Sequence, residues 1–194
     1  MTRLAPIELS DAPAHPEIWP PEIALVAAAG RHDRAALEVL LTATFPKVAG
    51  FFGARGCTRD EASELASETL IRIVENLPQL RNYNAYRTWC WRLAETVFRE
   101  WIRSKKKSAR AWKDPVDTHQ PTPEDEYEAY EEEKRVARAF ATLDPEEQTL
   151  LWLRHVEGLS YADVAQVRGS SVGAARVAAH RANKRLTELF EQLK

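Results

Sequence analysis

Aromatic and basic residues alternate along the segment from position 83 to position 103. An unpaired base can stack on an aromatic ring while a neighbouring arginine holds its phosphate, so such a segment can bind single-stranded nucleic acid. Trp89 and Trp101 share the apolar stripe of this segment and are expected to lie in the core. Trp91 lies off that stripe and is the better candidate for a stacking surface.

The segment from Arg168 to Lys194 is a second candidate nucleic-acid surface, because it holds six basic and two acidic residues. Small residues at a helix start can approach base edges, and basic residues beyond them can neutralise phosphates. The stripe expected to pack inward is Val172, Ala175, Ala179, Ala182, Leu186 and Leu189. The residues expected to point away from the core are Ala174, Arg176, His180, Arg181, Lys184 and Arg185. A solvated basic helix of an unrelated bundle is the alternative interpretation.

The segment 61–77 carries an acidic face opposite an apolar stripe. The stripe consists of Ala62, Leu65, Ala66, Leu70, Ile73 and Leu77. On the other face, four glutamates surround Ile71, namely Glu61, Glu64, Glu68 and Glu75. Taken alone, this face is typical of a solvated surface. An acidic patch with an apolar centre also suits docking on a basic partner helix.

The residues that covalent catalysis or metal binding would need are not grouped in this sequence. The five histidines are scattered, Cys57 and Cys90 are interpreted as reduced thiols, and there is no phosphate-binding loop. Acidic residues cluster at 124–133, where a linker would hold no fixed geometry. This pattern disfavours a nucleic-acid enzyme, and we expect no catalytic residue, no metal and no cofactor.

Glycine and proline are distributed as in an all-α protein. Neither occurs in residues 79–114, and no glycine lies between Gly56 and Gly158. Both residues cost most in helix interiors, so long segments free of them favour helices. The helices predicted in the first half run over 22–29, over 34–45 with a continuation after Pro46, over 61–77 behind an Asp60 cap, and over 84–106.

The second half carries the local signals of a helix-turn-helix, in which a glycine-containing turn joins two helices. Helix starts are indicated by capping residues and by a proline at the first position, and helix ends by glycine. In chain order these signals are Asp144-Pro145, Gly158, Ser160 with Asp163, Gly169, Ser170 or Ser171, and the end at Leu193.

These elements predict two small helical domains joined by an acidic, proline-containing linker. We expect a flexible tail over 1–21, a first domain over 22–113, a linker over 114–127 and a second domain over 128–194.

Charge is unevenly distributed along the chain. The 194 residues have a formal net charge of −2, with 44% hydrophobic and 29% charged residues, which excludes collagenous, membrane-spanning and wholly disordered chains. However, residues 31–113 sum to +7 and residues 114–134 to −8. Near-neutrality therefore does not exclude a nucleic-acid partner. The N-terminus lacks the pattern of a signal peptide, so we expect a cytoplasmic protein without membrane insertion.

Two regions of the chain together resemble the extracytoplasmic-function (ECF) sigma factors of bacterial RNA polymerase. In the C-terminal half, residues 143–165 read LDPEEQTLLWLRHVEGLSYADVA, and they are followed by SSVGAAR and HRA. In the N-terminal half, DEASELASETLIRIV at 60–74 resembles the helix by which such factors bind polymerase core. AYRTWCWRLA at 85–94 resembles their promoter-melting helix. Other helix-turn-helix regulators share the EGLSY turn, but both halves in this order are far more specific.

The resemblance implies three binding surfaces. The surface for polymerase core, which would meet the β′ clamp helices, comprises Glu61, Glu64, Leu65, Glu68, Ile71, Arg72 and Glu75. The surface for a −10-type promoter element comprises Asn82, Tyr83, Asn84, Tyr86, Arg87, Trp91, Arg92, Arg99, Arg103, Lys105 and Lys106. The surface for a −35-type element comprises Ser171, Gly173, Ala174, Arg176, His180, Arg181 and Lys184. The resemblance also implies contact with the β flap of polymerase and an anti-sigma factor as a further partner.

The chain departs from the family pattern at two places. Glu95-Thr96 stands where the family commonly has Arg-Asn, which puts an anion near the expected DNA face. At 176–179 the chain reads Arg-Val-Ala-Ala in place of Lys-Ser-Arg-Leu, so the promoter sequence is expected to be unusual. We also hypothesise that the acidic run 124–133 either lies across a basic polymerase channel or folds onto the basic block. The alternative to a sigma factor is a helix-turn-helix regulator whose N-terminal helices sense a ligand or dimerise.

Overall fold

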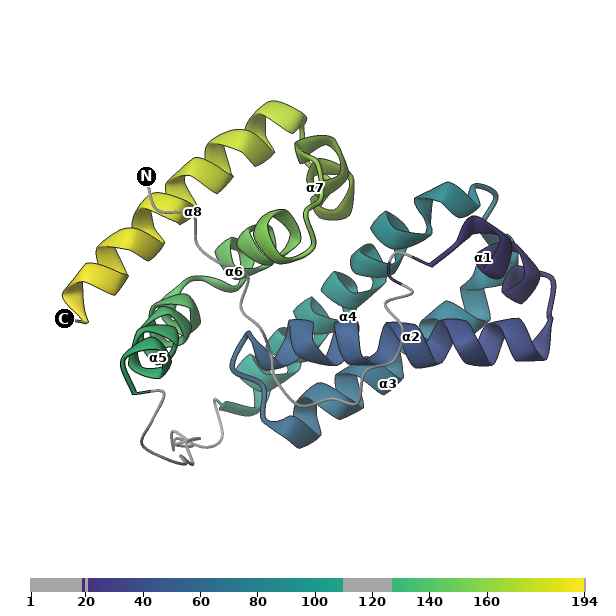
Figure 1. Cartoon of the computed structure of the whole chain (residues 1–194), viewed down its shortest axis with the longest axis horizontal. Helices are drawn as coiled ribbons and strands as arrows, with labels where there is room; N and C mark the ends of the chain where they lie inside the picture. Colours follow the sequence, from purple (N-terminus) through teal and green to yellow (C-terminus); the bar gives the residue numbers. More distant parts are fainter. Residues whose placement is uncertain (1–18, 20, 110–126, 194) are drawn as a thin grey trace. The chain divides into compact units, whose positions relative to one another are not determined.

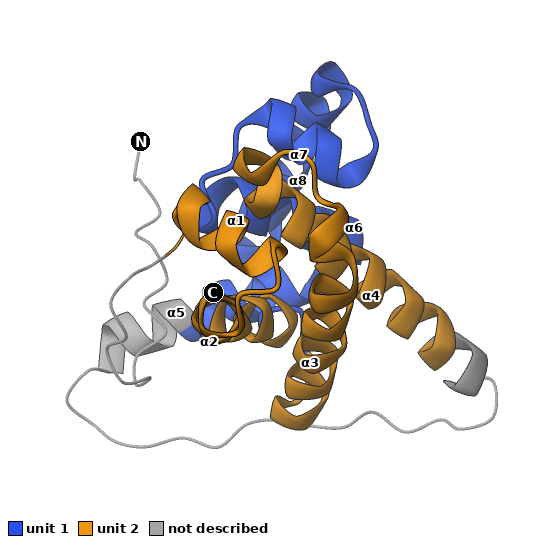
Figure 2. Ribbon diagram, turned by 90° about the vertical axis from the view of Figure 1, so that its right-hand side faces the viewer, with its two compact units in different colours: residues 1–11, 54–56, 115–194 blue, residues 12–53, 57–114 orange. Residues whose placement is uncertain are grey.

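The computed structural model describes the backbone of residues 19, 21–109 and 127–193, and the side chains of 19, 21–105 and 134–193. Within these ranges every regular element is helical, so the prediction of an all-α fold is confirmed (Figure 1). The helices divide between two compact units. One unit is built from residues 12–53 and 57–114, and the other mainly from residues 115–194 (Figure 2). The expected tail 1–21 and linker 114–127 lie largely outside the described residues, and the domain boundaries stay a prediction.

The first unit contains four α-helices connected by short turns. Their bounds are α1 (Ile23–Gly30), α2 (Arg34–Gly53), α3 (Arg59–Asn76) and α4 (Tyr86–Ala109). Two 3-10 turns, Leu77–Gln79 and Tyr83–Ala85, connect α3 to α4. Helix α2 contacts α1, α3 and α4, and α3 packs along α4, so one core is shared among the four helices.

Capping residues set the starts of α2 and α3. The backbone N–H of Ala36 donates to Asp33 Oδ1 at 3.0 Å, as expected for a capped α2. The prediction that Asp60 caps α3 is wrong, because Thr58 forms a reciprocal capping box with Glu61. Asp60 instead lies in the first turn, where its charge faces the positive end of the helix dipole.

Helix α2 is a long and largely apolar helix of the first unit. Among the described helices, it is the one long and apolar enough to cross a membrane by length and composition. Its side chains Leu40, Val48, Phe51 and Phe52 are fully buried in the unit. The helix also continues through Pro46, which was expected to interrupt it.

An aromatic cluster forms the centre of the first unit. The ring of Trp91 is fully buried, with centroids 5.2 Å from Phe51 and 5.9 Å from Trp19. The Tyr86 hydroxyl lies 3.0 Å from Thr44 Oγ1, and its ring packs edge-on against Trp19 at 6.4 Å. The prediction that Trp91 lies off the core is therefore wrong. The Trp19 ring, within the stretch expected as a tail, packs on this cluster.

The second unit consists of α5 (Tyr127–Thr142), α6 (Pro145–Leu151), α7 (Tyr161–Arg168) and α8 (Val172–Gln192). A π-helical turn, Trp152–Val156, extends α6. Helices α5, α6 and α7 all contact α8. Because α5 begins at Tyr127, residues 127–133 of the acidic run are helical, and the expectation that this run lacks fixed geometry is wrong there.

Small and aliphatic side chains fill the core of the second unit. Leu150, Leu153 and Val164 are fully or almost fully buried, as are Ala175 and Ala179 of α8. Alanines at these positions let α6 and α7 approach α8 closely. Val172 was expected in the same stripe, but it is 44% exposed. It occupies the first position of α8, at the edge of the packed stripe rather than within it.

Candidate nucleic-acid interface

The turn between α7 and α8 has the geometry of a helix-turn-helix. Ser160 and Asp163 form the predicted capping box at the start of α7. Gly169 adopts a left-handed conformation with φ of 66°, which a side chain would strain, and so ends α7 sharply. Ser171 then caps α8, because its Oγ accepts from the Ala174 N–H at 3.2 Å. Local chemistry therefore determines the angle at which α8 leaves the turn.

Helix α8 has one packed face and one cationic face. Ala175, Ala179 and Ala182 are buried, as expected from their spacing. The residues predicted to read a −35-type element are all exposed, namely Ser171, Gly173, Ala174, Arg176, His180, Arg181 and Lys184. Val177 is also exposed in the middle of this face, although it was not among the predicted residues. Because an α-helix turns by about 100° per residue, the sequence spacing already places Val177 opposite the buried Ala175 and Ala179.

An aromatic ring holds one of these cations in place. The guanidinium of Arg176 lies 5.6 Å from the centroid of the Tyr161 ring, and that of Arg154 lies 4.7 Å from the same centroid. Arg154 is itself fixed, because its Nη1 donates to the Leu159 carbonyl at 2.8 Å. Stacking on an aromatic face suits a guanidinium and restricts its rotamers. Tyr161 therefore links the start of α7 to the cationic face of α8.

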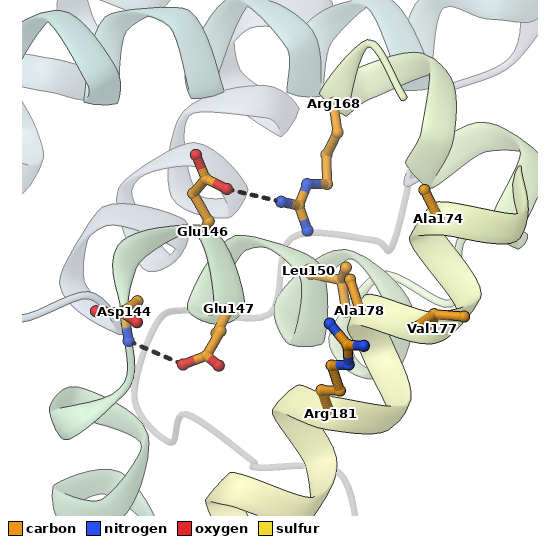
Figure 3. A pocket seen from close by; sticks show the side chains of 9 residues that line it. All are labelled: Asp144, Glu146, Glu147, Leu150, Arg168, Ala174, Val177, Ala178 and Arg181. Carbon is orange, nitrogen blue, oxygen red and sulfur yellow. Dashed lines mark hydrogen bonds and ion pairs between the residues drawn. The ribbon is translucent and has the colours of Figure 1, made fainter. Parts of the chain in front are cut away.

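Two arginines near α8 pair with the acidic start of α6. Arg168 Nη2 donates to Glu146 Oε2 at 3.1 Å (Figure 3). Arg185 lies 3.6 Å from Asp144 and 3.9 Å from Glu147, so it faces α6 and does not point away as expected. A shallow groove separates these elements, lined by Asp144, Glu146, Glu147, Leu150, Arg168, Ala174, Val177, Ala178 and Arg181. No described acidic side chain forms an ion pair with Arg176 or Arg181.

The acidic face of α3 is only partly free. Glu64, Glu68, Ile71 and Glu75 are exposed, as the docking hypothesis requires. Leu65 is 8% exposed, so its assignment to the polymerase surface is wrong: the side chain belongs to the core stripe. A groove between α3 and α4 is lined by Glu64, Leu65, Glu68, Arg72, Val97, Glu100, Trp101 and Ser104.

Ion pairs join α3 to α4 along this groove. Arg72 Nη2 lies 2.9 Å from Glu68 and 2.5 Å from Glu100, and these hydrogen bonds raise the pKa of Arg72 and lower that of Glu100. Glu61 pairs with Lys105. Burial opposes ionisation of Glu61, but hydrogen bonds from Lys105 and the Thr58 backbone outweigh it and lower its pKa. The Arg72–Glu100 and Glu61–Lys105 pairs both connect α3 to α4.

The residues predicted to contact a −10-type element fall into two groups. Asn82, Asn84, Arg92, Arg103 and Lys105 are exposed, and Asn82 Oδ1 accepts from the Asn84 N–H at 3.1 Å. Tyr83, Arg87 and Arg99 are half-buried, with the Tyr83 ring packed against Gly30. Tyr86 and Trp91 are buried, so neither ring faces solvent. The Lys106 side chain lies outside the described residues. Trp89 and Trp101, expected in the core, are half-buried.

Glu95 does not place an anion on the surface, contrary to expectation. Its side chain is almost fully buried, and Arg99 Nε donates to its Oε1 at 2.7 Å. The pair lies along one face of α4, four residues apart, where a carboxylate N-terminal to an arginine is favourable. The departure from the family pattern at this position is therefore compensated inside the helix.

Comparison with known proteins agrees with this architecture. Residues 133–186 match the family model for sigma-70, region 4. The chain is 26% identical over 181 residues to the ECF RNA polymerase sigma-E factor of Haemophilus influenzae, covering 88% of this chain and 95% of that relative. It is also 26% identical to the RNA polymerase sigma factor CarQ of Myxococcus xanthus, covering 81% of this chain and 91% of that relative.

Two solved structures share the fold. CnrH in complex with the cytosolic domain of CnrY aligns with a TM-score of 0.66 at 20% identity, over 88% of this chain and 97% of that one. The sigma factor RpoE of Bartonella quintana, in complex with the anti-sigma factor NepR, aligns with a TM-score of 0.65 at 18% identity, over 79% of this chain and 96% of that one. The second unit thus matches the sigma-70 region 4 model, and the chain is similar over most of its length to ECF RNA polymerase sigma factors.

Proposed function

We propose that this chain directs core RNA polymerase to promoters by dividing recognition between its two units. The second unit reads a −35-type element with α8, and the first unit binds polymerase through α3 and a −10-type element through residues 82–84 and α4. The observation that carries this proposal is the exposed cationic face of α8 behind a capped helix-turn-helix. A helix of this kind enters the major groove with its N-terminal residues toward the bases.

The polymerase surface of α3 is an apolar centre within acidic residues. Ile71 is 55% exposed and Val74 is 41% exposed, one turn apart on the same helix. Glu64, Glu68 and Glu75 surround them. Such a surface fits the basic helices of the β′ clamp, because burial of the aliphatic side chains supplies affinity and the carboxylates supply orientation. Arg72 supports the surface from its edge, held there by Glu68 and Glu100.

The surface for a −10-type element is smaller than the sequence predicted. Asn82, Tyr83 and Asn84 form the loop that would receive an unpaired base, and Arg92, Arg103 and Lys105 supply phosphate contacts. Trp91 and Tyr86 lie beneath this region as core residues and would support it from within. Melting then draws its free energy from base stacking and phosphate contacts that replace base pairs, without covalent chemistry.

We expect protein partners other than polymerase core to bind the same surfaces. CnrH and the Bartonella RpoE are seen bound to CnrY and to the anti-sigma factor NepR. By analogy, an anti-sigma factor would hold this chain inactive by covering α3 or α8. The β flap would bind the second unit within the holoenzyme. These partners are consistent with a chain that acts in the cytoplasm, together with polymerase and DNA.

The decisive experiment reconstitutes the full chain with core RNA polymerase and measures core binding and run-off transcription. Ile71→Asp should abolish core binding, because a carboxylate would replace the apolar centre of an acidic surface. Val39→Asp is the matched control, since Val39 is an aliphatic residue of α2 that is 43% exposed. Arg176→Ala should retain core binding but lose promoter-dependent transcription. Failure of the wild-type chain to bind core would overturn the proposal.

A further inference from the structure

Val177 is an exposed aliphatic residue at the centre of the cationic face of α8. Its side chain is 52% exposed. Since an α-helix turns by roughly 100° per residue, Val177 lies roughly 200° around the axis from both Ala175 and Ala179, which are buried. Val177 therefore projects almost directly away from the core of the second unit.

The neighbours of Val177 on this face are small or cationic. Gly173 and Ala174 precede it by one turn, and His180 and Arg181 follow it by one turn. In Figure 3, Val177 and Arg181 both project from the surface of α8. The result is an aliphatic spot bordered along α8 by cations on one side and by small residues on the other. It also lines the groove whose far wall is the acidic start of α6, where Glu146 is paired with Arg168.

A solvated basic helix gains nothing from valine at this position. The β-branched side chain lowers helix propensity relative to alanine or lysine, and 52% of the surface of Val177 stays in water. The lower helix propensity and the exposed apolar surface are both offset if a partner covers Val177 with an apolar group and neutralises the cations around it. The required partner is therefore a polyanion with an apolar spot on its contact surface.

The DNA major groove has this combination. Phosphates border the groove on both sides, and the thymine C5-methyl group is the apolar feature of the base edges within it. Cytosine presents an amino donor there, and guanine presents acceptors, which an aliphatic side chain would leave without partners. Small residues before Val177 remove the bulk that would otherwise keep α8 away from the bases.

We propose that Val177 selects a thymine in the −35-type element through contact with its C5-methyl group. The proposal rests on the proposed function, because it takes α8 as the helix that enters the major groove. Val177 is then a specificity-determining residue, whereas Arg176, Arg181 and Lys184 supply affinity through phosphates. A protein partner with an acidic surface could also meet these cations, but it would not depend on a thymine methyl group.

The test uses deoxyuridine, which pairs like thymine and lacks the methyl group. Holoenzyme is reconstituted from core polymerase and the full chain, and its preferred −35-type sequence is selected from a randomised duplex library. Each thymine of the selected sequence is then replaced singly by deoxyuridine, and the dissociation constant is measured. We expect one position at which the wild-type holoenzyme binds thymine about fourfold more tightly than uracil, the effect of burying one methyl group.

Variants assign that preference to Val177. Val177→Ala should bring the thymine-to-uracil ratio at this position close to one, and it should fold normally because alanine favours helix. Val177→Ile should keep the ratio. Val156→Ala is the matched control, because Val156 is a 46% exposed valine of the same unit outside α8, and its loss should leave the ratio unchanged.

The possible outcomes distinguish failure of the role proposed for Val177 from failure of the proposed function on which it rests. A holoenzyme that selects a defined sequence but shows equal affinity for thymine and uracil at every position would overturn the role of Val177 alone. Retention of the wild-type ratio by Val177→Ala would likewise overturn that role. A chain that binds neither core nor any preferred sequence would overturn the proposed function as well.

Discussion

The guanidinium of Arg176 lies 5.6 Å from the ring centroid of Tyr161, which connects the first residue of α7 to the cationic face of α8. The same ring carries Arg154 at 4.7 Å. An arginine held on a ring keeps fewer rotamers and loses less entropy when it binds a phosphate or a base. If α8 binds DNA as proposed, Tyr161 acts by positioning Arg176 rather than by contacting DNA itself.

We predict that Tyr161→Leu weakens promoter binding by the holoenzyme several-fold while Tyr161→Phe binds as the wild type does. The leucine variant retains every cation, so the slope of log K against log salt concentration should not change. Arg176→Ala, in contrast, should reduce that slope by about one. Binding measured by fluorescence anisotropy at several salt concentrations distinguishes the two effects. Equal loss in the leucine and phenylalanine variants would show that the ring does not position Arg176.

The second prediction concerns Trp19, whose ring covers Trp91 and Tyr86. Trp19→Ala should lower the free energy of unfolding by about 2 to 4 kcal/mol, because it removes a large ring from an aromatic cluster. Trp19→Phe should recover part of this loss, since an aromatic edge remains against Trp91. Urea unfolding followed by circular dichroism measures both variants. A Trp19→Ala chain with wild-type stability would contradict the packing of this residue.

The third prediction concerns the Arg72–Glu100 pair between α3 and α4. Glu100→Gln should cost at most about 1 kcal/mol, because both side chains are partly exposed and solvent screens the pair. Arg72 lowers the pKa of Glu100, so the folded state binds this proton less readily than the unfolded state. The pair therefore contributes to the free energy of unfolding above the ordinary carboxyl pKa. This contribution is lost as the pH falls through the lowered pKa of Glu100 in the folded state. The difference in the free energy of unfolding between wild type and Glu100→Gln should therefore shrink as the pH falls from 7 into the acidic range, which urea unfolding at several pH values measures.

The fourth prediction concerns His155, next to the helix-turn-helix. Desolvation and the charge of Arg154 lower its pKa, although a hydrogen bond with Asn183 opposes this. The unfolded state therefore binds the proton more readily, and stability should fall as the pH drops below about 6.5, the ordinary histidine value. His155→Gln should flatten the stability profile between pH 7.5 and pH 5. An unchanged profile would show that His155 does not contribute to it.

The local features of this fold were predictable because neighbours in the chain determine them. Ser160, Gly169 and Ser171 shape the helix-turn-helix through capping and a left-handed turn, which act over a few residues. The all-α architecture and the buried alanines of α8 also follow from residue spacing and breaker positions. These interactions need no distant partner, so the residue order alone is sufficient for them.

The errors arose where distant segments meet. Trp91 looked exposed from the period of its own helix, but Phe51 and Trp19 enclose it from other parts of the chain. The pairing of Arg72 with Glu100 likewise requires α3 and α4 to lie together. Periodicity identifies one face of a helix, whereas packing against several neighbours can bury more than one face.

Residue order alone is thus sufficient to specify the helices, their caps and the cationic character of α8. Which side chains remain available to partners depends on how the helices pack against one another. This packing withdraws Trp91, Tyr86 and Leu65 from the candidate surfaces and leaves Val177 exposed among cations. The physical reason is that burial depends on long-range contacts between helices, which local propensity and spacing do not specify.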